Sequence, residues 1–127
     1  MEYRGNDVHA DMDILWQAGQ THFPNTAISY SEAASTLNSV SCSSGSGVMN
    51  QWHNVKDYLQ QRVARSAEAL EDTGTALRQV AIDLAETDGE AATALNASME
   101  EYGEEPAEVP DAPLPENIQG PTEGSWD

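Results

Sequence analysis

The residues best able to do chemistry in this chain are three histidines and one cysteine, at His9, His22, His53 and Cys42. Their spacing matches no zinc-site pattern, because zinc sites bring pairs of Cys or His close together in the sequence. The chain also lacks the Glu-x-x-His pairs with which helix bundles hold two-metal carboxylate centres. We therefore expect no catalytic residues, no metal site and no cofactor, and we expect that the protein is not an enzyme.

Carboxylates dominate the charge of the chain. There are 22 acidic and 5 basic residues, which gives a formal net charge of −17. Such a surface repels nucleic acids and anionic lipids, whose binding begins with phosphate neutralisation by Lys and Arg. No apolar run approaches the roughly 20 residues needed to span a bilayer, so no membrane insertion is expected. The carboxylates in the middle of the chain are most simply the solvated face of a helix, at Glu68, Glu71, Asp72, Asp83, Glu86, Asp88 and Glu90.

A long helix is the element that must position these side chains. Apolar residues recur in steps of three or four, or sums of these, which keeps them on one face of an α-helix. The stripe consists of Trp52, Val55, Leu59, Val63, Leu70, Leu77, Val80, Leu84, Ala91 and Leu95. It predicts one helix over about 48–101, on the order of 80 Å long at about 1.5 Å per residue. A helix of that length has to lie against another helix and then against a partner.

A first helix is predicted over about 11–40, after a flexible N-terminus at 1–10. Its stripe includes Trp16, Phe23, Tyr30 and Leu37, and Pro24 falls inside the pattern. Proline removes one backbone hydrogen bond and clashes with the preceding turn. Because the stripe keeps its phase across the proline, we expect a bent but continuous helix.

The segment between the two helices, about 41–47, is rich in Ser and Gly and is expected to be a turn. The helices then form an antiparallel hairpin. The second helix is longer than the first, so Leu84 and Leu95 at its far end are expected to be uncovered. Five of the six prolines lie in the acidic segment 102–127, which has no Lys or Arg. This composition predicts a disordered tail, in which Trp126 is a possible docking residue.

The expected fold is thus all-α, a helical hairpin over 11–101 that is marginal alone and forms a four-helix bundle on dimerisation. The alternative is a monomer that tolerates exposed apolar residues. The residues expected at the partner interface are Trp16, Phe23, Tyr30, Leu37, Trp52, Leu59, Val63, Leu70 and Leu77.

This arrangement of helix, small turn, long helix and loose tail resembles the type VII secretion (ESX) substrates of the Trp-x-Gly family, the small early-secreted-antigen-like proteins. Ser43-Ser44-Gly45 stands where the family has Trp-x-Gly, and the phrase Leu84 to Asp88 stands where it has Tyr-x-x-x-Asp. The tryptophan and the tyrosine are both absent, so the chain is similar to divergent members.

The resemblance implies a protein that binds a partner and is exported by, or targets cargo to, a type VII secretion system. Its turn motif would include Ser43 and Gly45, and its export-signal-like residues would be Leu84 and Asp88. The implied partners are a related helical hairpin, in a homo- or heterodimer, or a larger secreted cargo, and the secretion ATPase.

The N-terminal residues lack a basic region followed by an apolar core, so secretion without a cleavable signal peptide is expected. One alternative is a cytoplasmic adaptor, chaperone or immunity protein that binds apolar helices. A second alternative is an acidic mimic of nucleic acid.

Overall fold

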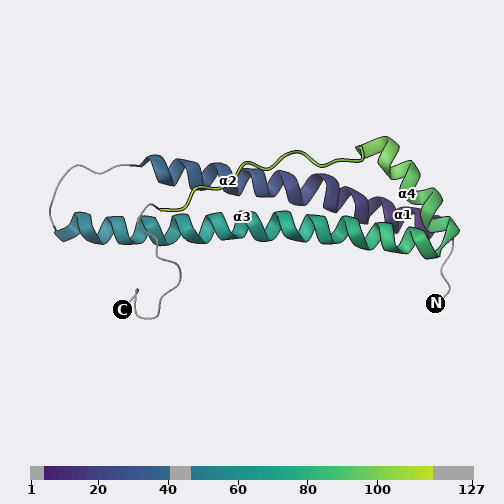
Figure 1. Ribbon diagram of the computed structural model, residues 1–127, viewed down its shortest axis with the longest axis horizontal. Helices are drawn as coiled ribbons and strands as arrows, with labels where there is room; N and C mark the ends of the chain where they lie inside the picture. The colour runs from purple at the N-terminus through teal and green to yellow at the C-terminus, as the bar shows by residue number, and fades with distance from the viewer. Residues whose placement is uncertain (1–4, 41–46, 116–127) are drawn as a thin grey trace.

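The computed structural model describes residues 5–40 and 47–115, and these two ranges contain helices and no strand. The predicted all-α class is therefore confirmed for the described residues. The elements are α1 (Gly5–Gln17), the π-helix η1 (Ala18–His22), α2 (Phe23–Ser39), α3 (Gly47–Thr87) and α4 (Gly89–Tyr102). α1, η1 and α2 follow one another without a gap and lie beside α3, while α4 packs on α1 and on the end of α3 (Figure 1).

The first helical run starts earlier than expected and passes Pro24 through a π-helical turn. α1 begins at Gly5 instead of about residue 11, because α4 supplies an apolar surface on which Val8 packs. At the proline, the Phe23 N–H donates to the Ala18 carbonyl, five residues back. The wider π turn places Pro24 at the start of α2, where a missing N–H costs little. The chain therefore continues past the proline without losing its helical course.

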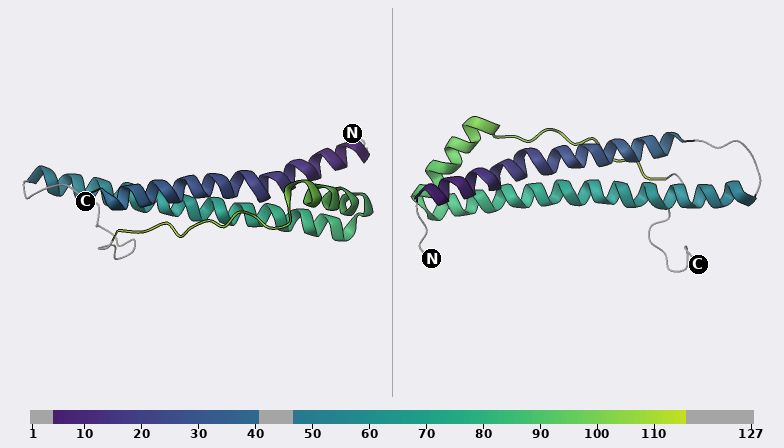
Figure 2. Two further views of the ribbon diagram at one scale, coloured as in Figure 1. Left: turned by 90° about the horizontal axis from the view of Figure 1, so that it is seen from above. Right: turned by 180° about the vertical axis from the view of Figure 1, so that it is seen from behind.

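The predicted single helix over 48–101 is wrong at Asp88, where the structure divides it into α3 and α4. Asp88 has an extended backbone, with φ −139° and ψ 117°, and its carboxylate accepts hydrogen bonds from the N–H groups of Glu90 and Ala91. An aspartate in this position satisfies free amides at a helix start. α4 therefore turns back along α1 instead of prolonging α3 (Figures 1 and 2).

α4 closes a core at this end of the molecule. Its hydrogen bonds to α1 are made by Asp13, whose carboxylate accepts from the Ser98 hydroxyl and from the Tyr102 hydroxyl, each at 3.0 Å. The indole N–H of Trp16 donates to the Gly103 carbonyl at 2.9 Å. The buried residues of this core, which we call the closed end, are Met12, Trp16, Ala81, Ala91, Ala94 and Leu95.

The segment after α4 also differs from the predicted disordered tail. Gly103 ends α4 with φ +92°, a conformation that favours glycine. Residues 103–115 then run in an extended form back along the helix pair, first beside α2 and then across to α3 (Figures 1 and 2). Hydrogen bonds from helix side chains hold them there, which a composition-based prediction cannot foresee. Residues 116–127, including Trp126, lie outside the described part of the chain.

α3 and the first helical run are antiparallel, with a register that moves the overhang to the other end of α3. Gly19 lies against Gly74, and the Gln60 amide donates to Asn38. The beginning of α3 consequently extends beyond the end of α2 (Figure 1), whereas the far end that was expected to be uncovered is packed against α4. Within the described residues, no helix combines the length and the hydropathy of a membrane span.

Candidate partner-binding face

α3 buries its small residues, not its large ones. The buried residues of α3 include Ala64, Ala67 and Gly74, together with Gln60 and Ala81. The backbones approach closely here: a Cβ added to Gly19 would lie 2.7 Å from the Gly74 carbonyl oxygen. Such an approach is possible only with small side chains on both helices. The interior along this pair is therefore thin and made of Ala, Gly and Ser.

The large apolar residues of α3 form a separate stripe that the chain leaves open. Leu59 is 44% exposed, and Val63, Leu70 and Leu77 are half-buried. With about 100° of rotation per residue, this stripe is centred roughly a quarter of a turn away from the buried one. Since four apolar side chains over five turns are only partly covered, α3 presents a continuous apolar strip along the molecule.

α2 adds residues to the same side of the molecule. Phe23, Tyr30 and Leu37 recur at intervals of seven, and Tyr30 is 40% exposed. In both helices, the large residues are rotated about the helix axis in the same sense away from the buried stripe. Because the two helices are antiparallel and bury facing stripes, this rotation places the large residues of both on one side of the pair. Ser31, in contrast, donates to the carbonyl of Pro110 and so faces the extended segment. We call the resulting surface the apolar face: Phe23, Tyr30, Leu37, Trp52, Leu59, Val63, Leu70 and Leu77.

One residue expected at the interface lies elsewhere. Trp16 is 1% exposed and belongs to the closed end, where α4 covers it. The helical pattern placed it on the interface stripe because it has the right spacing. The backfolding of α4, which the pattern does not encode, withdraws it from any external partner.

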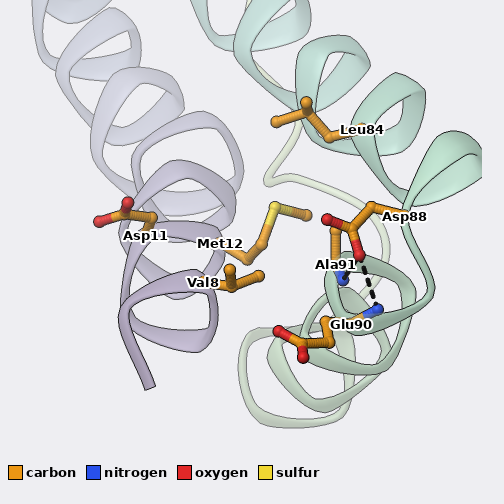
Figure 3. Close-up of a pocket in the computed structure, with 7 residues that line it drawn as sticks. All are labelled: Val8, Asp11, Met12, Leu84, Asp88, Glu90 and Ala91. Atoms are coloured by element: carbon orange, nitrogen blue, oxygen red, sulfur yellow. Dashed lines mark hydrogen bonds between the residues drawn. The ribbon is translucent and has the colours of Figure 1, made fainter. Parts of the chain in front are cut away.

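The two residues proposed as an export signal line a groove at the far end of α3. Leu84 and Asp88 contribute to an open depression of about 540 Å³ between α1, α3 and α4. In Figure 3, the side chain of Met12 lies between Leu84 and Ala91. The remaining lining residues are Val8, Asp11 and Glu90.

This groove differs from the bare helical tip that the sequence predicted. Asp88 is not in a helix with Leu84, and its carboxylate caps α4 at 2.9 Å from the Glu90 N–H. Leu84 stays 47% exposed. The prediction that both side chains lie on one helical face of an uncovered overhang is therefore wrong, because the Asp–Gly step at 88–89 allows α4 to fold back.

At the closed end, the titration of Tyr102 is perturbed. The hydroxyl of Tyr102 donates to the Asp13 carboxylate, and this hydrogen bond, with smaller contributions from desolvation and from the charges of Asp13 and Glu101, raises the pKa of Tyr102. The effect favours the protonated phenol in the folded chain. It stabilises the contact between α1 and α4 and suggests no reaction.

The described residues hold no group of three or more metal-ligating side chains. His9, His22 and His53 are all exposed, and they lie on α1, η1 and α3 respectively. The turn-motif residues Ser43 and Gly45 lie outside the described part of the chain, so the structure does not place them.

Sequence reasoning missed three buried polar residues that hold the extended segment: Gln20, Ser31 and Gln60. The sequence did indicate these residues, because each of the three occupies a helical position at which the buried stripe continues. A polar residue at such a position predicts a hydrogen-bonding partner, but not which segment supplies it.

Comparison with known proteins gives no match: no family model, no curated protein and no solved structure is significantly similar to this chain.

Proposed function

We propose that the protein acts by binding a second helical protein through the apolar face, with no bond made or broken. The observation that carries this is the separation of the two stripes of α3. The chain builds its own helix contacts from small residues and leaves Trp52, Leu59 and the neighbouring large side chains partly in water. A helix pair from a second molecule laid on this face completes a four-helix bundle.

The energetics favour such a complex. Fully burying a large apolar side chain stabilises by about 1.5–3 kcal/mol, and the apolar face has several that are only partly covered. Much of this gain is offset by the entropy cost of association. The best matched partner is another antiparallel helix pair, either a second copy of this chain or a related hairpin.

The direct test measures self-association by light scattering or sedimentation over a range of concentrations. The double variant Tyr30→Ser, Leu59→Ser removes two exposed side chains of the apolar face, so the monomer should remain folded. We expect the dimer dissociation constant to rise on the order of a hundredfold. A symmetric dimer loses four side chains, two from each copy, and each contributes about 0.7 kcal/mol because only its exposed part is newly buried.

The matched control is Ile14→Ser, which removes a large side chain that is 66% exposed and lies outside the apolar face. This variant should dimerise as the wild type does. If the wild-type chain stays monomeric at all concentrations, or if both variants weaken the dimer equally, self-association through this face is wrong.

Export by a type VII secretion system is the second candidate, in which the partner is a cargo or hairpin and the secretion ATPase reads the complex. It is supported by the resemblance and by the position of Leu84 and Asp88 on one open groove. The test compares Leu84→Ser with Val80→Ser in a host that has such a system, since both side chains are 47% exposed. Export should fall only for Leu84→Ser. Equal export of the two variants would show that this groove is not part of an export signal. Retention of the protein in the cytosol, bound to one partner, would favour an adaptor or chaperone.

A further inference from the structure

The side of the helix pair opposite the apolar face carries residues 103–115, which run beside α2 and then cross to α3 (Figures 1 and 2). We call these residues the tail segment and the surface beneath them the tail groove. The tail segment contains Pro106, Pro110, Pro113 and Pro115. A proline-rich extended chain has no internal hydrogen bonds and leaves its carbonyl groups free to accept them.

The tail groove recognises those carbonyl groups with buried side chains. The Ser31 hydroxyl donates to the Pro110 carbonyl at 2.7 Å, and the Gln60 amide donates to the Pro113 carbonyl at 3.0 Å. The Gln20 amide donates to the carbonyl of Glu105. The three donors are only 1%, 0% and 3% exposed, in that order. Buried donors aimed at the carbonyls of Glu105, Pro110 and Pro113 make a site that reads an extended backbone whose prolines lie at this spacing.

The tail segment nevertheless satisfies this site incompletely. The amide oxygens of Gln20 and Gln60 are buried and have no hydrogen-bond partner. Proline has no N–H to offer, so the segment that fills the groove is poor in the donors these oxygens need. An occupant with additional N–H donors beside these two amide groups offers what the tail segment lacks.

Charge also opposes the tail segment. Asp111 shares the walls of a small cavity of about 70 Å³ with Glu68 and Glu71 of α3. The segment carries Glu104, Glu105 and Glu108 as well, and no basic residue. Like charges held together are unfavourable, so the groove faces an acidic occupant with acidic walls.

We propose that the tail groove is a binding site for an extended, proline-rich segment of another protein that carries Lys or Arg, and that the chain's own tail segment occupies it as a weak competitor. Lys and Arg supply both of the features that the tail segment lacks. Their positive charge pairs with Glu68 and Glu71, and their N–H groups donate to buried amide oxygens. The prolines keep the backbone extended and present its carbonyls to Ser31 and Gln60.

This site is separate from the apolar face and does not depend on the function proposed for it. A helical partner on one side and an extended segment on the other could be bound at the same time. Binding of the segment would displace residues 103–115 from α2 and α3.

The experiment titrates the full chain with a fluorescently labelled synthetic peptide of residues 103–115 carrying the changes Glu104→Lys, Glu105→Lys, Glu108→Lys and Asp111→Lys. We expect saturable binding that is at least about tenfold tighter than that of the unchanged acidic peptide, and that weakens as salt screens the charges. Equal affinity for the two peptides would contradict the charge argument.

A protein with net charge −17 attracts any cationic peptide, so the decisive control is a peptide of the same composition in scrambled order. The scrambled peptide should bind at least about tenfold more weakly. On the protein, Ser31→Ala and Gln60→Met each remove one donor and should weaken binding of the basic peptide about three- to tenfold. Ser35→Ala, on the exposed side of α2, should not.

Two groove variants are used because substitution of a buried residue can disturb folding. Circular dichroism shows which of the two remains helical. The proposal is overturned if the scrambled peptide binds as tightly as the ordered one. It is also overturned if a folded Ser31→Ala or Gln60→Met variant binds the basic peptide as the wild type does.

Discussion

The closed end and the apolar face both contain large apolar residues, but the closed end buries them whereas the apolar face leaves them partly exposed. At the closed end, Trp16 is 1% exposed and lies among α1, α3 and α4, whereas Trp52, on the apolar face of α3, is 38% exposed. The first region is stabilised within the chain, and the second is the surface that we propose a partner covers. Stability and association should therefore respond to different substitutions.

The largest expected effect separates the two tryptophans. Trp16→Ala removes a fully buried indole and its hydrogen bond to Gly103, and should lower the free energy of unfolding by about 3–5 kcal/mol. Trp52→Ala should change it by no more than about 0.5 kcal/mol, while weakening self-association. Urea unfolding at a concentration where the chain is monomeric measures both. Similar losses for the two variants would show that the distinction between the regions is wrong.

Two glycines give the next contrast. Gly19→Ala would place its Cβ 2.7 Å from the Gly74 carbonyl oxygen and 2.8 Å from Cγ of Arg78, so the helices must move apart. Overpacking of this kind costs about 1–3 kcal/mol. Gly89→Ala meets nothing within 4 Å and should stabilise by about 0.4–1 kcal/mol, because alanine restricts the unfolded chain. Thermal unfolding followed by circular dichroism compares the two, and a neutral Gly19→Ala would contradict the close helix crossing.

Capping of α4 distinguishes two aspartates of equal charge. Asp88→Ala removes the acceptor of the Glu90 and Ala91 N–H groups and should cost about 1 kcal/mol. Asp83→Ala removes a carboxylate that accepts only from the Gln79 side chain on the exposed side of α3, and should cost less than about 0.5 kcal/mol. Hydrogen exchange of α4 amides should rise only for Asp88→Ala. If exchange rises equally for both, net charge and not capping determines the stability of α4.

The smallest effect depends on pH and again concerns the closed end. The raised pKa of Tyr102, caused first by its hydrogen bond to Asp13, means that the folded chain holds the phenol proton more tightly than the unfolded chain. The stabilisation is therefore fully present below pH about 10 and is lost as pH rises through the folded pKa.

Tyr102→Phe should remove this alkaline component of the stability profile. Tyr30→Phe, on the apolar face, should leave it unchanged. The measurement is the urea midpoint between pH 7 and pH 11. A profile that is the same for wild type and Tyr102→Phe would show that the hydrogen bond does not contribute.

Hydrophobic periodicity alone identified the helical regions. It also showed that large residues such as Leu59 and Leu77 share one side of their helix, because the rotation per residue is a local property of the backbone. The composition of the tail segment predicted disorder, whereas residues 103–115 are held on the helix pair by hydrogen bonds such as those from Ser31 and Gln60.

Only the tertiary structure decided which stripe each helix buries and where the chain turns back. Large apolar residues were the natural candidates for the core, but Gly19 and Gly74 let the backbones approach so closely that small residues fill the interior. The break at Asp88 and the docking of residues 103–115 depend on contacts with segments more than 50 residues away in the sequence, such as the hydrogen bonds from Tyr102 to Asp13 and from Ser31 to Pro110. A local period carries no information about such contacts, because they exist only after the helices have come together.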